Sequence, residues 1–233
     1  MDCQCNSRGS IHLIVGPMFS GKTTELLRQC RRHTLAKRKV AVVKYAKDTR
    51  YDDRMLSTHD GLKMEGLRAM KLADVWGELR ESDVVGIDEG QFFEDVVERT
   101  ERLADEGKTV IVASLDGDFR RKPFESIAQL VPLAETVEKR AAVCQFCGHS
   151  ASFTLRTIVS DVREVIGGAE AYKAACRDCF RLKEEVDRQE QKKPAALPPF
   201  RSKTPELPHG ERHVSAIKNI DENRGAEDES RVS

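Results

Sequence analysis

The 233-residue chain has no net charge, few aromatic residues and no long apolar run. Its 39 Lys and Arg residues equal its 39 Asp and Glu residues in number, so no overall positive field attracts nucleic acid or another polyanion. No segment approaches the ~20 consecutive apolar residues that cross a bilayer. The first ten residues are polar and lack the apolar core of a secretion signal. These absences argue against nucleic-acid and membrane partners, and we expect a cytoplasmic protein.

What is present over the first 143 residues is a succession of apolar segments that predicts an α/β fold. Short runs rich in β-branched residues predict strands at 11–15, 40–46, 84–88 and 109–115. Amphipathic patterns predict helices over 23–39 and 92–105. Residues 48–66 are polar without a clear period, and we expect a long loop there. Apolar strands joined by helices favour a parallel sheet with helices on both faces.

The composition changes at residue 144 and again at residue 194. Two Cys-x-x-Cys pairs, short β-type segments near 152–158 and a charged helix over 178–192 indicate a small second module. Five of the eight prolines but one aromatic residue fall in the last 40 residues, which cannot bury enough apolar surface to order. The predicted organisation is a flexible N-terminus (1–10), an α/β domain (11–143), a metal-binding module with its closing helix (144–193) and a disordered tail (194–233).

Residues 16–23, GPMFSGKT, match the phosphate-binding pattern G-x-x-x-x-G-K-[ST]. The pattern lies between a predicted strand and a predicted helix, where backbone N–H groups and the positive end of the helix dipole face phosphate oxygens. In such loops the Lys reaches the β and γ phosphates and the hydroxyl residue ligates Mg²⁺. The fold class expected is therefore P-loop NTPase-like (RecA-like). The phosphate-binding residues expected are Gly16, Pro17, Met18, Phe19, Ser20, Gly21, Lys22 and Thr23.

Two adjacent carboxylates follow the strand predicted at 84–88. Asp88 ends that strand, where these folds place the second acidic residue of the Mg²⁺ site. Glu89 comes next, and because successive strand residues point to opposite sides, it can accept a proton from an attacking hydroxyl while Asp88 faces the metal. The alternative is that Glu89 only caps a turn at an acidic strand end.

The module that begins at residue 144 carries four cysteines in two Cys-x-x-Cys pairs, with 28 residues between the pairs. Four thiolates at this spacing suit a closed tetrahedral Zn²⁺ site, which would be structural and would supply folding free energy. Two local disulfides and an iron–sulfur cluster are the alternatives, but compartment and spacing favour zinc. The expected ligands are Cys144, Cys147, Cys176 and Cys179.

Six motifs, in order, resemble those of the cytosolic-type (type II) thymidine kinases. They are GPMFSGKTTEL, KYAKDTRY, THD, IDEGQFF, LDGDFRRKPF and GGAEAYKAACRDC, and the resemblance extends from about residue 11 to about residue 180. It implies transfer of the γ-phosphoryl group of ATP to the 5′-hydroxyl of thymidine, and of deoxyuridine, to give the monophosphate in pyrimidine salvage. It also implies a homotetramer.

The same resemblance implies roles for individual residues. Glu89 is implied to be the general base and Asp88 to belong to the Mg²⁺ site. Further contacts with the nucleotide are implied at Asp48, Thr49, Arg50 and Gln91. The nucleoside pocket, including a lid (lasso) loop held between the two cysteine pairs, is implied to comprise Phe92, Leu115, Phe119, Phe124, Thr154, Arg163, Glu164, Val165, Ile166, Gly167 and Tyr172.

Two other functions are alternatives to this interpretation. Nucleoside monophosphate kinases with a zinc lid usually insert their cysteines between core elements, whereas both pairs here follow the last predicted strand of the α/β domain. A DNA-associated ATPase with a zinc ribbon needs a basic surface. The last 40 residues hold six basic and seven acidic residues, which leaves the rest with a net charge of only +1, and this is weak support for DNA binding.

Overall fold

The computed structural model describes residues 9–48, 55–57, 63–158 and 167–192. The chain divides by its contacts into two units, Met1–Lys193 and Pro194–Ser233, and all of the described residues lie in the first. Within the described residues, no helix is both long enough and apolar enough to span a membrane. The expected flexible N-terminus and disordered tail fall almost entirely outside the described residues. So do six predicted site residues, namely Thr49, Arg50, Arg163, Glu164, Val165 and Ile166.

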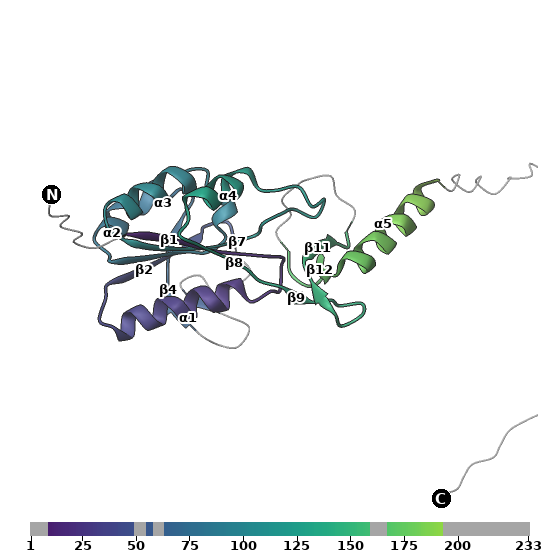
Figure 1. Ribbon diagram of the computed structural model, residues 1–233, viewed down its shortest axis with the longest axis horizontal. Helices are drawn as coiled ribbons and strands as arrows, with labels where there is room; N and C mark the ends of the chain where they lie inside the picture. The colour runs from purple at the N-terminus through teal and green to yellow at the C-terminus, as the bar shows by residue number, and fades with distance from the viewer. Residues whose placement is uncertain (1–8, 49–54, 58–62, 159–166, 193–233) are drawn as a thin grey trace, which may run out of the picture. The chain divides into compact units, whose positions relative to one another are not determined.

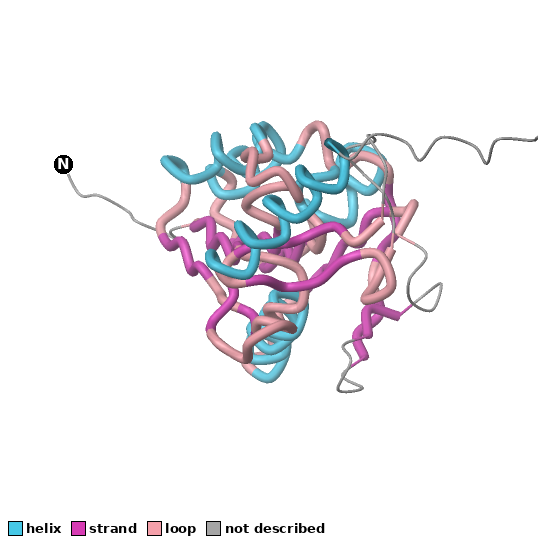
Figure 2. Tube along the Cα trace, turned by 90° about the vertical axis from the view of Figure 1, so that its right-hand side faces the viewer, coloured by secondary structure: helices cyan, strands magenta, loops and turns pink. Residues whose placement is uncertain are grey.

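A six-stranded, entirely parallel sheet forms the centre of the α/β domain (Figure 2), which confirms the predicted fold class. The order of strands across the sheet is β5-β2-β6-β7-β1-β8. Strands β6 and β7 are buried along their whole length, which is why they read as unbroken apolar runs. The strands are β1 (Ser10–Val15), β2 (Val40–Tyr45), β5 (Leu67–Ala69), β6 (Val84–Ile87), β7 (Thr109–Ser114) and β8 (Thr136–Lys139).

Helices cover both faces of this sheet (Figure 1). Helix α1 (Lys22–Leu35) packs on one face against β1, β2, β6 and β7. Helices α3 (Val96–Asp105) and α4 (Glu125–Leu130) lie on the other face. The short helices at the ends of strands are η1 (Leu72–Val75), α2 (Trp76–Arg80), η2 (Gly90–Phe92) and η3 (Val131–Leu133).

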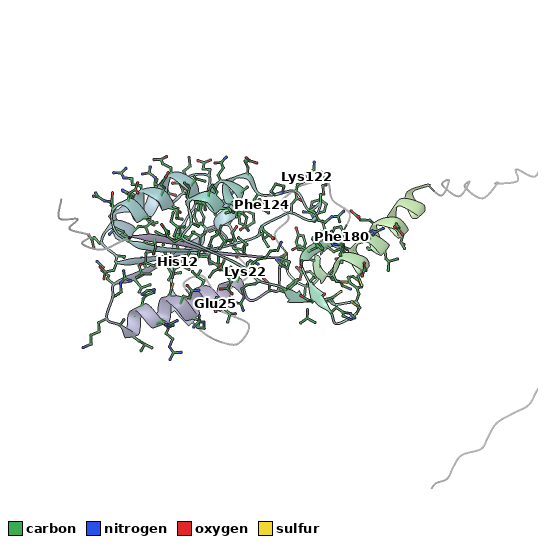
Figure 3. All side chains as sticks on the ribbon, in the orientation of Figure 1. His12, Lys22, Glu25, Lys122, Phe124 and Phe180 are labelled. Carbon is green, nitrogen blue, oxygen red and sulfur yellow. The ribbon has the colours of Figure 1, made fainter. Side chains whose placement is uncertain are left out.

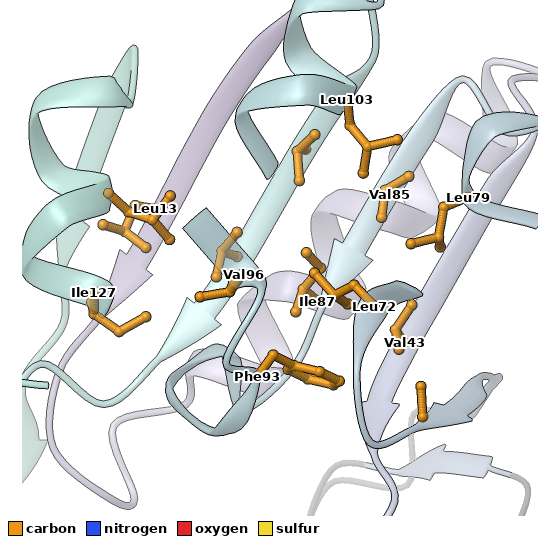
Figure 4. Close-up of a cluster of buried hydrophobic side chains, with 14 of the residues drawn as sticks. Leu13, Val43, Leu72, Leu79, Val85, Ile87, Phe93, Val96, Leu103 and Ile127 are labelled. Carbon is orange, nitrogen blue, oxygen red and sulfur yellow. The ribbon is translucent and has the colours of Figure 1, made fainter. Parts of the chain in front are cut away.

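The larger apolar cluster fills the space between the sheet and helices α3 and α4 (Figure 4). It includes Leu13, Ile87, Phe93, Leu103 and Ile127, each 2% exposed or less. A second cluster on the opposite face packs helix α1 against the strands and holds Ile14, Leu26, Leu27, Cys30, Val42 and Ile111. Helix α1 lies so close to β6 that a Cβ added at Gly86 would be 2.8 Å from the Cys30 sulfur. The sheet is therefore fixed in position from both sides.

The cysteine module, residues 142–192, is built from short elements. Strands β9 (Ala142–Val143) and β10 (Ser150–Ala151) form one antiparallel pair, and β11 (Phe153–Arg156) and β12 (Tyr172–Ala175) form another. Helix α5 (Arg177–Lys192) follows β12 and contacts both β11 and β12. The charged helix expected over 178–192 is confirmed.

Three predicted boundaries differ from the structure. The helix expected over 23–39 ends at Leu35, because Lys37 takes a left-handed conformation with φ of 61° that ends the helical path. The helix expected over 92–105 begins at Val96, since residues 90–95 form η2 and a turn. Within the loop expected at 48–66, strands β3 (Met55–Ser57) and β4 (Lys63–Glu65) form an antiparallel hairpin. Three-residue strands are too short to show a period.

Candidate active site

The loop between β1 and α1 has the backbone that its two glycines permit. Gly16 has a φ of 149° and Gly21 a φ of 73°, values that favour glycine. A Cβ at Gly16 would lie 2.4 Å from the carbonyl oxygen of Arg140. Phe19 also has a positive φ, 65°, in a loop that turns sharply into the helix. The two glycines of the sequence pattern therefore stand where the backbone before α1 has positive φ values, and at Gly16 there is also no room for a side chain.

Hydrogen bonds inside the loop keep it compact. The Ser20 hydroxyl donates to the Pro17 carbonyl oxygen at 2.8 Å, and the Lys22 ammonium donates to the same oxygen at 2.7 Å. In Figure 3, Lys22 lies at the end of α1 that faces the loop. The loop therefore presents an ammonium group and the positive end of a 14-residue helix to one place, which is the chemistry that binds phosphate groups.

Thr23 and Asp88 form a pair of oxygen donors beside this loop. The Thr23 hydroxyl lies 3.1 Å from each oxygen of the Asp88 carboxylate. Burial, together with the negative charges of Glu89 and Asp48, raises the pKa of Asp88 to about 7, against the opposing effects of Thr23 and Lys22. A hard divalent cation prefers such oxygen ligands and would favour the ionised carboxylate. The donor set therefore fits Mg²⁺.

Asp48 is the third carboxylate of this group. It follows the end of β2, is 4% exposed, and its backbone N–H donates to the Tyr45 carbonyl oxygen at 3.0 Å. Its negative charge contributes to the raised pKa of Asp88. The predicted nucleotide residue Asp48 thus lies near the predicted metal residue, although the two are forty positions apart along the chain.

Glu89 lies one residue beyond Asp88, in a left-handed conformation with φ of 55° and ψ of 44°. Such a backbone is uncommon for a residue other than glycine, and strained residues of this kind cluster at functional sites. Glu89 precedes the short helix η2, but its side chain makes no capping hydrogen bond. Its carboxylate accepts a hydrogen bond from the Gln91 side chain at 2.7 Å. The turn-cap alternative therefore finds no support in this geometry.

The amide of Gln91 extends from Glu89 to the end of the neighbouring strand β7. Its oxygen accepts hydrogen bonds from the Ser114 hydroxyl at 2.7 Å and from the Leu115 backbone N–H at 3.0 Å. The side chain is 7% exposed. Gln91 was expected to contact the nucleotide; in this structure both ends of its amide bind groups of the protein.

The aromatic residues predicted for the nucleoside pocket fall into three places. Phe92 lies against Tyr45, with 5.2 Å between ring centroids. Phe119 and Tyr172 both contact Arg156, as described below. Phe124 is 7% exposed and belongs to the apolar cluster between the sheet and α4, where it precedes the first residue of that helix. Its position therefore makes it a core residue at the edge of the site.

Arg156, at the end of β11, was missed by the sequence analysis. Its guanidinium carbon lies 3.7 Å from the Phe119 ring centroid, within the range of a cation–π contact. The same guanidinium donates a hydrogen bond to the Tyr172 hydroxyl at 3.1 Å. Arg156 is only 9% exposed. The signal that could have revealed it is an arginine inside a short β segment, a residue type that is seldom buried without partners.

Residues 117–123 form a tight loop centred on Asp118. One oxygen of the Asp118 carboxylate accepts hydrogen bonds from the backbone N–H groups of Arg120 and Lys122, each at 2.9 Å. Gly117 pairs with Pro123 across the base of the loop. This arrangement fixes the backbone on both sides of Phe119. An Asp that binds backbone groups two residues onward is typical of turns, so the segment LDGDFRRKP carried this signal.

Arg121, from the same loop, reaches the cysteine module. Its guanidinium lies 3.2 Å from the Glu184 carboxylate and 4.6 Å from the Phe180 ring centroid, both on α5. Phe180 is almost fully buried. The loop that carries Phe119 is therefore held from the module as well as from the sheet.

Thr154 connects the module to the phosphate loop. The backbone N–H of Met18 donates to the Thr154 hydroxyl at 3.0 Å, and Thr154 is 5% exposed. Two residues predicted for different substrates are therefore in direct contact. Leu115, half-buried, lies at the end of β7. Gly167 is the one lid residue among those described, and a Cβ there would lie 2.8 Å from the Ala171 Cβ.

The four predicted metal ligands come together in the cysteine module. The sulfur atoms of Cys144, Cys147, Cys176 and Cys179 all lie within 4.8 Å of one another, and no disulfide joins them. A tetrahedral Zn²⁺ with Zn–S bonds of about 2.3 Å requires sulfur atoms about 3.8 Å apart, so only small adjustments are needed. The cluster therefore fits zinc, and the four thiols stand as free groups rather than in the two local disulfides of the alternative.

The surroundings of Cys144 also favour a metal. Burial alone would raise the pKa of Cys144, but hydrogen bonds from the backbone N–H groups of Cys176, Phe146 and Cys147 lower it to about 6, which stabilises the thiolate, the form of cysteine that binds metal. At the other end of the cluster, hydrogen bonds with Cys147 and Cys176 raise the pKa of Cys179 to about 12. The His149 ring nitrogen lies 3.4 Å from the Cys147 sulfur.

Comparison with known proteins gives one consistent result. The family model described as thymidine kinase matches residues 9–180. "Thymidine kinase, cytosolic" of Gallus gallus is 56% identical over 173 residues, covering 74% of this chain and 77% of the relative. The protein of the same description from Homo sapiens is 54% identical over 174 residues, covering 75% and 74%. "Thymidine kinase" of Variola virus is 51% identical over 172 residues, covering 74% of this chain and 97% of the relative.

Proposed function

This chain belongs to the thymidine kinase family and phosphorylates thymidine to dTMP, and we propose that Glu89 is the general base of that reaction. The observation that carries the proposal is the position of Glu89. It lies one residue beyond Asp88, at the end of a central strand and beside the phosphate loop, with one carboxylate oxygen held by Gln91. A base must lie within hydrogen-bonding reach of the proton that it accepts.

The triphosphate of ATP is assigned to residues 16–23. Backbone N–H groups of the loop and the Lys22 ammonium face the phosphate oxygens, and Lys22 exchanges its bond with the Pro17 carbonyl for one with phosphate. Asp48, Thr49 and Arg50 are proposed to complete this side of the site. Thr23 and Asp88 would hold Mg²⁺, which supplies positive charge to the β- and γ-phosphates when bound.

In the proposed reaction, the 5′-oxygen of thymidine attacks the γ-phosphorus of ATP. The bond between that phosphorus and the bridging oxygen breaks, and its electron pair leaves with ADP. The 5′-hydroxyl proton passes to the Glu89 carboxylate and later to solvent. Because phosphoryl transfer proceeds through a loose transition state, most of the catalysis comes from positioning and electrostatic stabilisation, which the loop and the carboxylate group supply.

Thymidine is proposed to bind where the module meets the sheet domain. Phe119 and Tyr172, which both contact the Arg156 guanidinium, would offer flat apolar surface to a pyrimidine ring. Phe92, Leu115 and Thr154 are proposed to line the same pocket, with Phe124 beneath it, and Arg163, Glu164, Val165, Ile166 and Gly167 to form the lid. Deoxyuridine, which has the same ring without the methyl group, is proposed as a second substrate.

Zinc is proposed to have a structural role. Four thiolates leave no open position for a substrate. Cys176 follows directly after strand β12, which carries Tyr172, and Cys179 lies in the first turn of α5. The metal would thereby fix the strand that follows the lid. We also propose a homotetramer in the cytoplasm. Light scattering should give a mass about four times the 26.2 kDa of one chain.

The test of the general base is Glu89→Gln, which keeps the shape of the side chain and removes its basicity. We expect kcat to fall by ~10² to 10⁴-fold, with the KM for ATP changed less than threefold. The matched control is Glu94→Gln, because Glu94 is exposed and pairs with Lys71 on the surface. A fall of less than threefold in kcat for Glu89→Gln would refute the assigned role.

A substrate screen separates this function from the alternatives. Transfer of labelled phosphate from ATP to thymidine and deoxyuridine, with none to nucleoside monophosphates, agrees with the family. Hydrolysis of ATP stimulated by DNA, without nucleoside phosphorylation, would instead indicate a DNA-associated ATPase.

A further inference from the structure

The side chain of Gln91 links Glu89 to the neighbouring strand β7 through three hydrogen bonds. Its Nε2 lies 2.7 Å from Oε2 of Glu89, and its Oε1 lies 2.7 Å from the Ser114 hydroxyl and 3.0 Å from the Leu115 backbone nitrogen. Gln91 is 7% exposed and Ser114 is fully buried. All three distances are those of good hydrogen bonds, so the link is short and shielded from water.

The chemistry of the three partners fixes which way the amide points. The Leu115 backbone N–H can only donate, so the amide oxygen must face it. The amide NH₂ group then faces Glu89, whose carboxylate accepts the bond. A group with a donor at one end and an acceptor at the other is required here, and the glutamine amide supplies both without carrying a charge.

Glu89 needs such a support because its side chain has three rotatable bonds and leaves the backbone at a strained, left-handed turn. A neutral amide can hold the carboxylate without adding a positive charge that would compete for it, as Lys or Arg would.

We infer that Gln91 is a positioning residue that holds the Glu89 carboxylate against the end of strand β7. It acts through Glu89, whereas the sequence analysis had assigned it a contact with the nucleotide. Ser114 and the Leu115 N–H fix the amide in turn. The inference rests on the proposed role of Glu89 as general base.

The experiment is a double-mutant cycle with Gln91→Met, which has nearly the length and volume of glutamine but no hydrogen-bonding amide. In the native background we expect kcat to fall about 10- to 100-fold, with the KM values for ATP and thymidine changed less than threefold. In the Glu89→Ala background, which has no carboxylate to position, Gln91→Met should change kcat less than twofold. The matched control is Gln129→Met, on the exposed face of α4, which should change neither parameter.

Two results would overturn the inference. One is an equal loss of kcat from Gln91→Met in both backgrounds, which would show that Gln91 does not act through Glu89. The other is a raised KM for ATP with an unchanged kcat, which would indicate that Gln91 contacts the nucleotide instead. If Gln91→Met lowers the melting temperature too far to assay, Ser114→Ala takes its place. It removes one of the two donors to the amide oxygen and should lower kcat about two- to fivefold, again only when Glu89 is present.

The same data separate this inference from the proposed function. A small effect of Glu89→Gln alone refutes the general base. A large effect of Glu89→Gln combined with an unconditional effect of Gln91→Met refutes only the positioning role.

Discussion

The sheet domain and the cysteine module both carry residues of the proposed active site but hold their shapes by different means. Strands β6 and β7 are buried along their full length, and apolar clusters pack on both faces of the sheet. In the module, strands of two to four residues surround two small clusters, one of which consists of alanines and cysteines. Such a small apolar area cannot offset the entropy of ordering. The comparison teaches that burial holds the sheet domain together, whereas the module needs a further source of stability, such as the zinc proposed for its four cysteines.

The two parts also serve different substrates in the proposed reaction. The sheet domain carries the phosphate loop and the carboxylates, and the module carries Arg156, Tyr172 and the strand after the lid. A substitution in one part should therefore change the affinity for one substrate, or the stability of that part, more than the other. The following predictions test that separation.

The largest effect is expected from Cys176→Ser, which removes one of the four sulfur ligands. Because structural zinc supplies about 10 kcal/mol or more of folding free energy, we expect loss of the metal and a rise of at least tenfold in the dissociation constant for thymidine. The affinity for ATP should change less than threefold. Metal analysis and titration calorimetry check both. Cys30→Ala, in the sheet domain, should keep its zinc, and an equal loss of affinity for both substrates would contradict the comparison.

A cavity in the sheet domain should have the next largest effect. Leu27 is fully buried between α1 and the sheet, so Leu27→Ala should lower the free energy of unfolding by about 2–5 kcal/mol. Urea denaturation measures this, and the zinc content should stay at one ion per chain. Leu35→Ala, at the end of the same helix and 75% exposed, is the control and should cost less than about 0.5 kcal/mol. Loss of zinc from Leu27→Ala would show that the two parts unfold together.

Close packing of α1 on β6 predicts a smaller effect with a specific rescue. A methyl group at Gly86 would lie 2.8 Å from the Cys30 sulfur, so Gly86→Ala should cost about 1–3 kcal/mol by overpacking. Replacement of Cys30 by Ala removes that sulfur, and the double variant should recover part of the loss. Additive costs in the double-mutant cycle would rule out this contact as the cause.

The smallest effect concerns the acid sensitivity of the helix that follows the phosphate loop. The hydrogen bond from Arg28, followed by those from Gln29 and the charge of Arg140, lowers the pKa of Glu25 against the effect of burial. Because the folded state favours the ionised form, this stabilisation is present above the unfolded pKa and is lost as the pH falls through the folded value. Glu25→Gln should therefore lower stability by less than about 1 kcal/mol near pH 7. The difference from the native protein should disappear in acid, and a difference that grows as the pH falls would contradict this account.

The parts of the fold that could be predicted are the buried strands, because burial requires an apolar sequence that can be recognised. Strands β1, β2, β6 and β7 are apolar because they are covered, so their runs were visible. Strand β8 was missed because it lies at the edge of the sheet and its four residues are all exposed, which leaves no apolar pattern. The hairpin of β3 and β4 was missed because its strands are three residues long.

The candidate site divides in the same way. The phosphate loop, the Asp88–Glu89 pair and the four cysteines depend on residues at fixed spacing along the chain, so the sequence predicts them. Arg156 is positioned by a contact with Phe119, 37 positions earlier in the chain. Gln91 is positioned by a hydrogen bond with Ser114 on another strand. Contacts of this kind depend on tertiary structure, and no local sequence pattern predicts them.

The hydrogen bond from the Met18 N–H to the Thr154 hydroxyl has a consequence for inhibitor discovery. A compound that binds at the proposed nucleoside pocket and displaces Thr154 also removes an acceptor from the phosphate loop. Such a compound would weaken ATP binding without occupying the ATP site, and kinetic competition alone would misassign where it binds. Bisubstrate ligands that preserve this contact should therefore be preferred over those that separate the two residues.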